Sequence, residues 1–578
     1  MSKLIYIVHR HENKDKSPEN KLYNLAKNIS PKNISSKDPI IYNNAKLSYV
    51  LINPTNTIKY KDGNVLLGAF FKTEDWTNFN SSGFDGNYAL FRVNSSKMEI
   101  LTDVLATRTV WYFQDSRLFI AATSQRAIIQ YLGEFKFNES VIPWMISSGS
   151  LGPKLSWDSR IKKIPADAVL SLDRKEWKIR IKKTPVKFKA STAPKKELKI
   201  KLKAKLEKVF TNLPLDFSKW VTSLSGGYDS RAILNLLIHT GHKKEQIKTV
   251  TWGVPEFLSK KNSDASVAQE LANALKIDHT FFNTEGHSEA KDIHAIFTLF
   301  LKNGEGRNDH IPSYMDGFKI WKTLYDNEVQ GVIRGDEVFG YNKIYSEAIV
   351  KDFTGITKCS DFSNLQKYPY IKSIEQKLPE EFLRQKNESL DTWKDRIFHL
   401  YRIPIIQSSL ADLKYCYIEQ INPFLSRDIV YQVRELPDNL RRDKKLFREI
   451  VQPLGPQIPY SSPSHSQLSF KDILRRADIV SEIQRELNSS NAQIIFPQDF
   501  LNAVMENMKT SQKKVNNSTS WKTRLKDLMP VSIKKMLAQK NLTLELDENV
   551  LAFRLYIVCR MHRILEQDSK ILSQKENN

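Results

Sequence analysis

The stretch VTSLSGGYDSRAIL, Val221 to Leu234, decides the fold. Its first letters are typical of a strand that ends at Leu224, and its last letters begin an apolar run typical of a helix. Between the two, Gly226 and Gly227 leave room for an anion to approach the backbone N–H groups at a helix N-terminus. The stretch therefore predicts a cradle for phosphate or pyrophosphate.

The polar side chains of this loop indicate a nucleotide with a metal ion. Ser225 and Ser230 can donate hydroxyl hydrogen bonds to phosphate oxygens. Phosphates would repel the Asp229 carboxylate unless a cation lay between them, so Asp229 predicts Mg²⁺. The lysine that a Walker loop requires is absent. The alternative is a tight strand–helix turn that uses glycine for its geometry alone.

The residues around this loop alternate between strand-like and helix-like patterns. This alternation predicts a parallel sheet covered by helices. The expected strands are 219–224, 247–253 and 278–283, and the expected helices are 195–213, 230–241 and 263–276, the last with Ser263 as its N-cap. Beyond about residue 343 the pattern is mostly helical.

The first part of the chain, to about residue 184, is β-rich. Short apolar runs such as LSYVLIN, NVLLGAFF and NYALFRVN are separated by Gly, Asn, Asp and Ser, which predicts layered antiparallel sheets. The polar, proline-containing stretch 182–196 then breaks the pattern. A chain of 578 residues is too long for one core, so we predict two units, 1–185 and 195–578.

The composition predicts a cytoplasmic protein. No apolar run approaches the roughly 20 residues that a membrane helix needs. The N-terminal apolar stretch is also shorter than the roughly 7–15 residues of a secretory signal. The three cysteines, Cys359, Cys416 and Cys559, form no CxxC pair, which argues against zinc ribbons and disulfide frameworks.

The formal charge of +23 is concentrated partly in residues 174–208, which are dense in lysine. A nucleic-acid or anionic-membrane contact is one interpretation. A solvated linker and helix face is the other, and we favour it because no arginine-rich or aromatic-interleaved motif accompanies the lysines. We therefore expect neither a nucleic-acid nor a membrane partner.

LSGGYDSR, residues 224–231, resembles the pyrophosphate loop of the asparagine synthetase family of ATP-pyrophosphatases. Other stretches agree in order: GVIRGDEVFGY (331–341) is similar to the second acidic loop, TWGVPE (251–256) to the adenine-holding turn, and 421–451 to the C-terminal segment. Residues 84–129 and 146–173 resemble the glutaminase half of asparagine synthetases. The resemblance implies an Ntn-hydrolase-like first domain and an adenine-nucleotide α-hydrolase-like second domain.

The resemblance also implies a reaction and a site. ATP would adenylate a substrate carboxylate and release pyrophosphate, and an amine would then displace AMP to form an amide. The implied catalytic residues are Asp229, Asp336, Glu337 and Lys445. The implied nucleotide-binding residues are Leu224, Ser225, Gly226, Gly227, Asp229, Ser230, Trp252 and Gly335. Asp229 and Asp336 would share Mg²⁺, and Glu337 would hold the metal or shape its loop.

Three departures from the family pattern qualify this reading. Family glutaminases use a cysteine at position two, where this sequence has Ser2, a far weaker nucleophile, so we expect no glutamine hydrolysis. A misassigned start codon is the alternative. The glutamate of the second loop falls at Ile333 or Arg334, and an arginine there could stabilise phosphate charge. A phosphate-contacting lysine would fall in 458–470, which has none.

Three residues could replace that lysine, namely Lys445, Arg448 and Lys471, and we choose Lys445. The sequence thus predicts an ATP-dependent, amide-forming ligase that takes a small-molecule or peptide carboxylate, with ammonia or a substrate amine as nucleophile. Relatives without the cysteine include β-lactam synthetases and lasso peptide cyclases. The alternatives are an RNA-modifying ATP-pyrophosphatase, which would explain the positive charge, and a non-catalytic ATP-binding scaffold.

Overall fold

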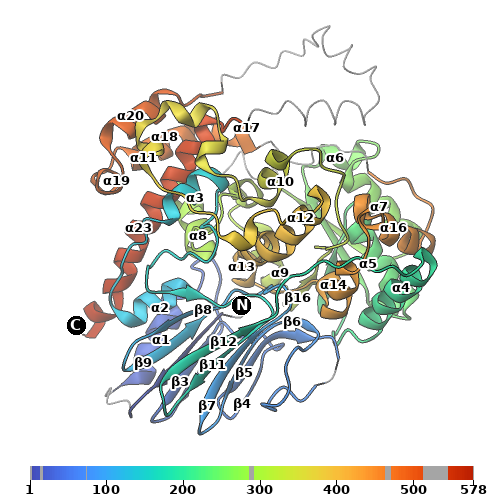
Figure 1. The fold of residues 1–578 in the computed structure, drawn as a ribbon, viewed down its shortest axis with the longest axis horizontal. Coiled ribbons are helices and arrows are strands. Elements are labelled where there is room, and N and C mark those ends of the chain that lie inside the picture. Colours follow the sequence, from blue (N-terminus) through green and yellow to red (C-terminus); the bar gives the residue numbers. More distant parts are fainter. Residues whose placement is uncertain are drawn as a thin grey trace.

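Residues 3–183 form two stacked antiparallel sheets, seen at the bottom of Figure 1. The computed structural model describes residues 3–12, 17–72, 74–284, 292–461, 470–511 and 544–576. The first sheet has the order β10-β8-β9-β1-β3-β2, and the second has the order β12-β11-β7-β6-β5-β4. Their strands are β1 (Lys3–His9), β2 (Ile40–Asn43), β3 (Leu47–Ile52), β4 (Lys59–Lys61), β5 (Asn64–Phe70), β6 (Gly86–Val93), β7 (Lys97–Thr102), β8 (Trp111–Gln114), β9 (Leu118–Ala122), β10 (Lys162–Lys163), β11 (Ala168–Asp173) and β12 (Lys178–Lys183).

The central strand β1 explains why the sheets stack. Tyr6 and Val8 point into the core between the two sheets, whereas Ile5 and Ile7 point to the other face, where α1 (Pro18–Ile29) and α2 (Gln125–Leu132) cover the sheet. Since successive side chains of a strand face opposite sides, a strand buried on both faces reads as one apolar run. The run at Lys3–His9 therefore lacks the alternation that would identify it as a strand from sequence.

The second part of the chain is built on a five-stranded parallel sheet with the order β15-β14-β13-β16-β17. Its strands are β13 (Trp220–Ser223), β14 (Lys248–Gly253), β15 (Asp278–Asn283), β16 (Gly331–Ile333) and β17 (Glu419–Ile421). Helices α4 (Lys195–Thr211), α5 (Tyr228–His239) and α7 (Asp264–Leu275) accompany it. Ser263 caps α7, its side chain accepting from the Ser266 N–H at 3.0 Å. The α/β class is confirmed: a part with layered antiparallel sheets is followed by a helix-covered parallel sheet.

The remaining helices surround these sheets (Figure 1). They are α3 (Val141–Ser148), α6 (Glu256–Ser259), α8 (Ile293–Gly304), α9 (Lys319–Asp326), α10 (Glu347–Thr354), α11 (Pro369–Ser373), α12 (Leu390–Ile397), the π-helix η7 (Phe398–Gln407), α13 (Ser408–Tyr415), α14 (Arg427–Arg434), α15 (Asp438–Arg441), α16 (Lys445–Val451), α17 (Phe470–Leu474), α18 (Ala477–Leu487), α19 (Ser490–Ile495), α20 (Gln498–Glu506) and α23 (Glu548–Glu576), with short 3₁₀ turns between them. None of the described helices combines the length and the apolar character that crossing a bilayer requires.

Helix α23 joins the C-terminal helices to the antiparallel part. It packs against α2, α3 and α18 and runs along one side of the molecule in Figure 1. Its Asp568 accepts from the Arg126 guanidinium of α2 at 2.6 Å, with both side chains buried. The segment between β12 and α4, residues 184–194, contains the predicted boundary, and the division into two units stays a prediction.

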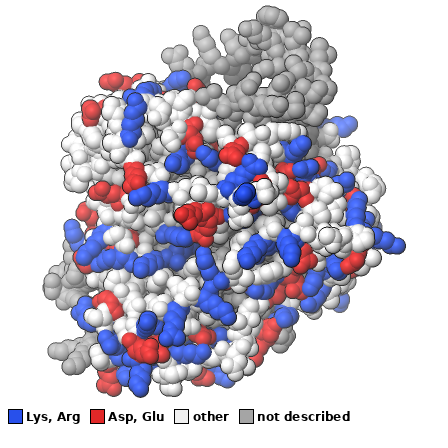
Figure 2. All heavy atoms as spheres, in the orientation of Figure 1, with Lys and Arg blue, Asp and Glu red and all other residues white. Residues whose placement is uncertain are grey.

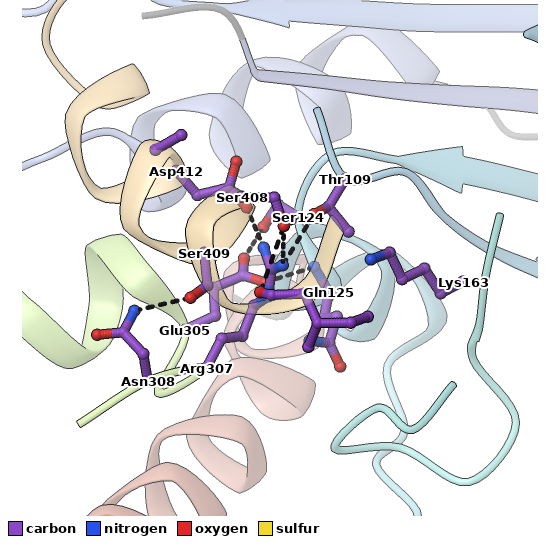
Figure 3. Close-up of polar contacts among 12 residues, drawn as sticks. Thr109, Ser124, Gln125, Lys163, Glu305, Arg307, Asn308, Ser408, Ser409 and Asp412 are labelled. Carbon is purple, nitrogen blue, oxygen red and sulfur yellow. Dashed lines mark hydrogen bonds and ion pairs between the residues drawn. The ribbon is translucent and has the colours of Figure 1, made fainter. Parts of the chain in front are cut away.

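A buried polar network fills part of the interface between the antiparallel part and the helices around the parallel sheet (Figure 3). Arg307 forms an ion pair with Asp412 of α13 and donates to Thr109 at 2.8 Å. Glu305 accepts from the Ser124 hydroxyl and from the Gln125 N–H, the latter at 2.9 Å. Nearby, the buried Arg108 pairs with the buried Glu419 of β17. Arg307 is therefore paired within its own part and bonded across the interface through Thr109, whereas the Arg108–Glu419 pair itself crosses the interface.

Lysines of the lysine-rich region pair with neighbouring acids. On α4, Lys201 pairs with Glu197 at 2.6 Å, and both Lys205 and Lys208 reach Asp428. Over the face shown in Figure 2, lysine and arginine are interspersed with acidic side chains. This is the arrangement expected of a solvated helix face, and the expectation of no nucleic-acid partner stays a prediction.

Candidate nucleotide site

The sheet topology brings two predicted loops together. β14 and β15 lie on one side of β13, whereas β16 and β17 lie on the other, so the strand order changes direction between β13 and β16. Open α/β sheets bind ligands at the carboxyl ends of strands beside such a switch point. The glycine loop follows β13 and the second acidic loop follows β16, and both therefore reach this edge.

The glycine loop is held by its two serines. The Ser225 N–H donates to the Ser230 Oγ at 2.9 Å, and the two hydroxyls lie 2.8 Å apart. Helix α5 begins at Tyr228, two residues earlier than expected, and no side chain caps its N-terminus. The first N–H groups of α5 are thus available to an anion, as the sequence predicts for pyrophosphate.

Gly226 is required by a close contact rather than by the turn. Neither glycine of the pair adopts the left-handed conformation. A Cβ on Gly226 would lie 2.5 Å from the Ser461 Cβ, because the segment ending at Ser461 crosses the loop. The Ser461 N–H donates to the Gly226 carbonyl at 3.0 Å, and the Ser461 hydroxyl donates to Asp264 at 2.6 Å. A further segment therefore lies directly against the cradle.

The crossing segment is held on the outside by aromatic and cationic groups. The rings of Tyr460 and Tyr228 stack with centroids 3.7 Å apart. Arg231 donates to the carbonyls of Ile458 and Pro459 at 2.6 and 3.0 Å. The resemblance expected a phosphate-contacting lysine in 458–470, and residues 462–469 lie outside the described residues.

A lysine nevertheless reaches the acidic groups, and it is Lys444 rather than Lys445. The Lys444 ammonium lies 2.6 Å from Asp229 Oδ2 and 3.1 Å from Glu337 Oε1. Lys444 precedes α16 with a left-handed φ of 54°, whereas Lys445 starts the helix and is exposed. The left-handed backbone before α16 therefore directs Lys444, rather than the predicted Lys445, toward these carboxylates. Nothing in the described contacts brings Arg448 or Lys471 to these carboxylates.

Asp336 is held by basic and amide groups on its other side. The Arg334 Nε donates to Asp336 Oδ2 at 3.3 Å. The Asn422 amide, oriented so that both of its polar atoms are satisfied, donates to the same oxygen at 2.9 Å. A Cβ on Gly335 would lie 3.0 Å from the backbone of Asp229 and Ser230, so this loop packs tightly against the start of α5. Gly335 thus permits the close approach of the two loops.

The electrostatics of the cluster follow from burial and pairing. Burial raises the pKa of Asp229, with Lys444 opposing and Asp336 adding to the shift. Burial, assisted by the Asp229 charge and opposed by Lys444, raises the pKa of Glu337 to about 7. Burial also favours neutral Asp336, but Arg334, with Lys414 and Asn422, outweighs it, and the pKa of this carboxyl is lowered. Asp229 and Glu337 therefore share the Lys444 ammonium, whereas Asp336 is held by Arg334.

Most of the predicted nucleotide-binding residues line one cavity of about 280 Å³. They are Leu224, Ser225, Asp229, Ser230, Trp252, Gly335 and Asp336. Gly226 and Gly227 lie in the loop backbone, and Glu337, only 3% exposed, lies behind Lys444. An adjoining cavity of about 140 Å³ shares Trp252 and Arg334 and is also lined by Lys414 of α13.

The donor set at the site fits Mg²⁺. Asp229 Oδ1 is buried and has no hydrogen-bond partner, whereas Asp229 Oδ2 accepts a hydrogen bond from the Lys444 ammonium. The described residues hold no group of three or more His, Cys, Asp or Glu arranged for a metal. Mg²⁺ commonly takes only one or two protein carboxylates and completes its shell with substrate phosphates and water. Asp229 and Asp336 could supply those carboxylates.

Sequence reasoning missed two basic residues at this site. Lys444 stands beside the chosen Lys445, and only the backbone turn distinguishes the two. Lys414 is 7% exposed and lies over the Trp321 ring at 5.6 Å, and burial together with Arg334 lowers its pKa well below the usual range. No motif marks Lys414, since a lone lysine in a helical pattern carries no signal.

Residues 217–410 match the family model described as asparagine synthase. The match covers about a third of the chain and includes both loops of the site, but it ends before Lys444. It supports an ATP-dependent, amide-forming ligase of the asparagine synthetase type.

Two further comparisons add little. No curated protein matches the chain significantly. Among solved structures, the chain is similar to a glutamine phosphoribosylpyrophosphate amidotransferase from B. subtilis complexed with ADP and GMP. The identity is 10% and the TM-score is 0.20, and the match covers 48% of this chain and 65% of that one. A likeness this weak does not bear on the activity of the chain.

Proposed function

We propose that the protein activates a substrate carboxylate with ATP, releasing pyrophosphate, and then joins the acyl group to an amine. The observation that carries this proposal is the meeting of Asp229, Glu337 and Lys444, which come from three separate segments at the switch point of the sheet. A scaffold that needed only a stable turn would not require two buried carboxylates there, one with an unpartnered oxygen.

The proposed roles follow from position. Ser225, Ser230 and the first N–H groups of α5 bind the pyrophosphate portion of ATP, and Leu224 and Trp252 flank the adenosine. Lys444 neutralises phosphate charge when it leaves Asp229 for the nucleotide. Mg²⁺, held by Asp229 and Asp336, would stabilise the charge that develops on the leaving pyrophosphate. Glu337 positions Lys444 through the ion pair between their side chains.

The acceptor carboxylate is placed in the adjoining cavity of about 140 Å³. Arg334 and Lys414 line this cavity, and the described residues place no carboxylate in ion-pair contact with Lys414. A bound carboxylate would favour the charged form of Lys414, and this ammonium together with Arg334 would hold the carboxylate near the α-phosphorus and favour in-line attack. Ammonia or an amino group of a second substrate supplies the nitrogen.

We further propose that the antiparallel part hydrolyses no glutamine. Ser2 lies outside the described residues, so the support comes from the cysteines. Cys359, Cys416 and Cys559 are all buried, and burial raises the pKa of each thiol. A buried, protonated thiol is a poor nucleophile. Incubation with glutamine should release no ammonia above the level of a heat-denatured sample.

The deciding experiment is ATP–pyrophosphate exchange with a library of carboxylates, followed by mass spectrometry for the acyl-adenylate. Exchange that depends on one carboxylate and on Mg²⁺ supports the proposal. ATP binding without exchange for any carboxylate would favour the scaffold. RNA binding that weakens steeply with salt, together with adenylation of RNA, would favour the RNA-modifying alternative.

A further inference from the structure

A third cavity, of about 600 Å³, lies away from the nucleotide site where the two parts of the chain meet. Three segments form its walls: the loop 153–166 around β10, the connecting segment 184–187, and the π-helix η7. Sites of about 300–1,000 Å³ at domain interfaces are the usual size and place for small-molecule binding.

The walls of this cavity are mainly apolar. Leu155 and Ile161 come from the first wall, Val186 from the second, and Leu400 and Ile405 from η7. η7 turns as a ten-residue π-helix with Pro404 inside it. π-Helical turns are rare and are found frequently at functional sites. The irregular helix lines the cavity with Leu400, Pro404 and Ile405, while its Phe398 and Ile403 pack into the core.

The charged groups around the cavity are strongly unbalanced. Six basic residues line it, namely Lys154, Lys162, Lys163, Lys183, Lys187 and Arg396, against the single acid Glu381. Glu381 is shared by Lys154 at 2.6 Å and Lys183 at 3.0 Å. Arg396 is paired with Glu388 at 2.7 Å. The described residues place no carboxylate in ion-pair contact with the other three lysines.

Lys163 lines the cavity beside η7. Its ammonium donates to the Pro404 carbonyl of η7 and points toward the Arg307 network, as Figure 3 shows. Burial and the Arg307 guanidinium lower its pKa well below the usual range, opposed by Asp412. An amine in such surroundings lacks a counter-ion, and an anion brought into the cavity would supply one.

We propose that this cavity binds an amphiphilic carboxylate, whose apolar body lies against η7 and whose head group meets Lys163. Apolar walls select the body through burial of apolar surface, and the excess of lysines selects the charge. The inference does not rest on the proposed ligase activity, because the cavity and the nucleotide site share no residue.

The test is calorimetric titration of the full-length protein with dodecanoate below its micelle concentration. Acetate and dodecanamide are the controls, since the first lacks the apolar body and the second lacks the charge. Saturable binding of dodecanoate alone is expected. Equal binding of dodecanamide, or no saturable binding of dodecanoate, would overturn the proposal.

Three variants locate the site. Lys163→Met should weaken dodecanoate binding about tenfold or more, because a charge-assisted contact is lost. Lys182→Met, an exposed neighbour on β12 that does not line the cavity, should leave binding unchanged. Glu381→Gln should tighten binding, because it frees Lys154 and Lys183 from their shared partner.

Glu381→Gln keeps the test decisive if Lys163→Met fails to fold. Glu381 is a partly exposed side chain whose amide form retains its size, so folding should be unaffected. Unchanged or weaker binding in Glu381→Gln would contradict the placement of the ligand in this cavity. Unchanged dodecanoate binding in a folded Lys163→Met variant would contradict the contact between the head group and Lys163.

Discussion

The nucleotide site and the Arg307 network are both buried clusters of charged side chains, and they differ in what they leave unpaired. In the network, Arg307 is satisfied by Asp412, Thr109 and Ser408, and Glu305 by Ser124 and Gln125. In the nucleotide site, a buried Asp229 oxygen has no partner and the Glu337 pKa is raised to about 7. Arg307 and Glu305 thus have their charges satisfied within the protein, whereas Asp229 keeps one carboxylate oxygen open to a ligand.

The largest effect is expected for Asp229→Asn. Loss of this carboxylate removes one proposed metal ligand and one partner of Lys444, and ATP–pyrophosphate exchange should fall about a thousandfold, or about 4 kcal/mol. Thermal stability should change little, because the amide oxygen can still accept from Lys444, Glu337 keeps that ammonium paired, and burial already disfavours the charge of Asp229. If the Asp229→Asn variant keeps its exchange activity, the open carboxylate oxygen does not distinguish a ligand site from the Arg307 network.

Arg307→Met should have the opposite profile, with a large cost in stability. It leaves Asp412 buried without its ion pair and should lower the free energy of unfolding by about 3 kcal/mol, measured as a lower thermal midpoint. The double variant R307M/D412L should recover much of the loss, since no charge then stays unpaired. If the double variant is less stable than Arg307→Met, the cost of the single substitution does not come from leaving Asp412 unpaired.

Lys444→Met tests the corrected lysine against its neighbour. Removal of the ammonium should reduce exchange about a hundredfold, or about 2.7 kcal/mol, because the triphosphate charge loses a partner. The matched control is Lys445→Met, which should retain full activity because Lys445 is exposed. A larger loss of exchange in Lys445→Met than in Lys444→Met would favour the sequence-based prediction of Lys445.

Lys205→Met should have the smallest effect. Lys205 and Lys208 both reach Asp428, at 3.2 and 3.1 Å, and all three side chains are partly exposed. Exposed pairs contribute about 0–1 kcal/mol, so the thermal midpoint should move by no more than a degree or two. A loss as large as that of Arg307→Met would mean that surface and buried pairs do not differ here.

The fold could be predicted where local pattern and topology agree. The strand–glycine loop–helix unit at Val221–Leu234 and the alternation after it fix the parallel sheet, and Ser263 caps the helix as expected. β1 was missed as a strand, because burial on both faces removes the alternation that identifies one. Its pairing is long-range and leaves no local signal.

The site could be predicted where a motif carries it and not where tertiary structure does. Asp229 and Asp336 follow strands that lie side by side, so their loops meet in one cavity. Lys444 is distinguished from Lys445 only by a left-handed residue before α16, and Lys414 only by its burial. Neither the backbone conformation at Lys444 nor the burial of Lys414 can be predicted from a short stretch of sequence.

Helix α23 has a practical consequence for experiments on separate parts of the protein. Its buried face lies against α2 and α3 of the first part of the chain and against α18 of the C-terminal helices. Its Asp568 forms an ion pair with Arg126 of α2. A fragment that ended before Glu548 would expose that apolar surface and leave Arg126 without its counter-ion. Expression of either half alone should therefore yield aggregated material, and the intact polypeptide is the smallest unit suitable for assay.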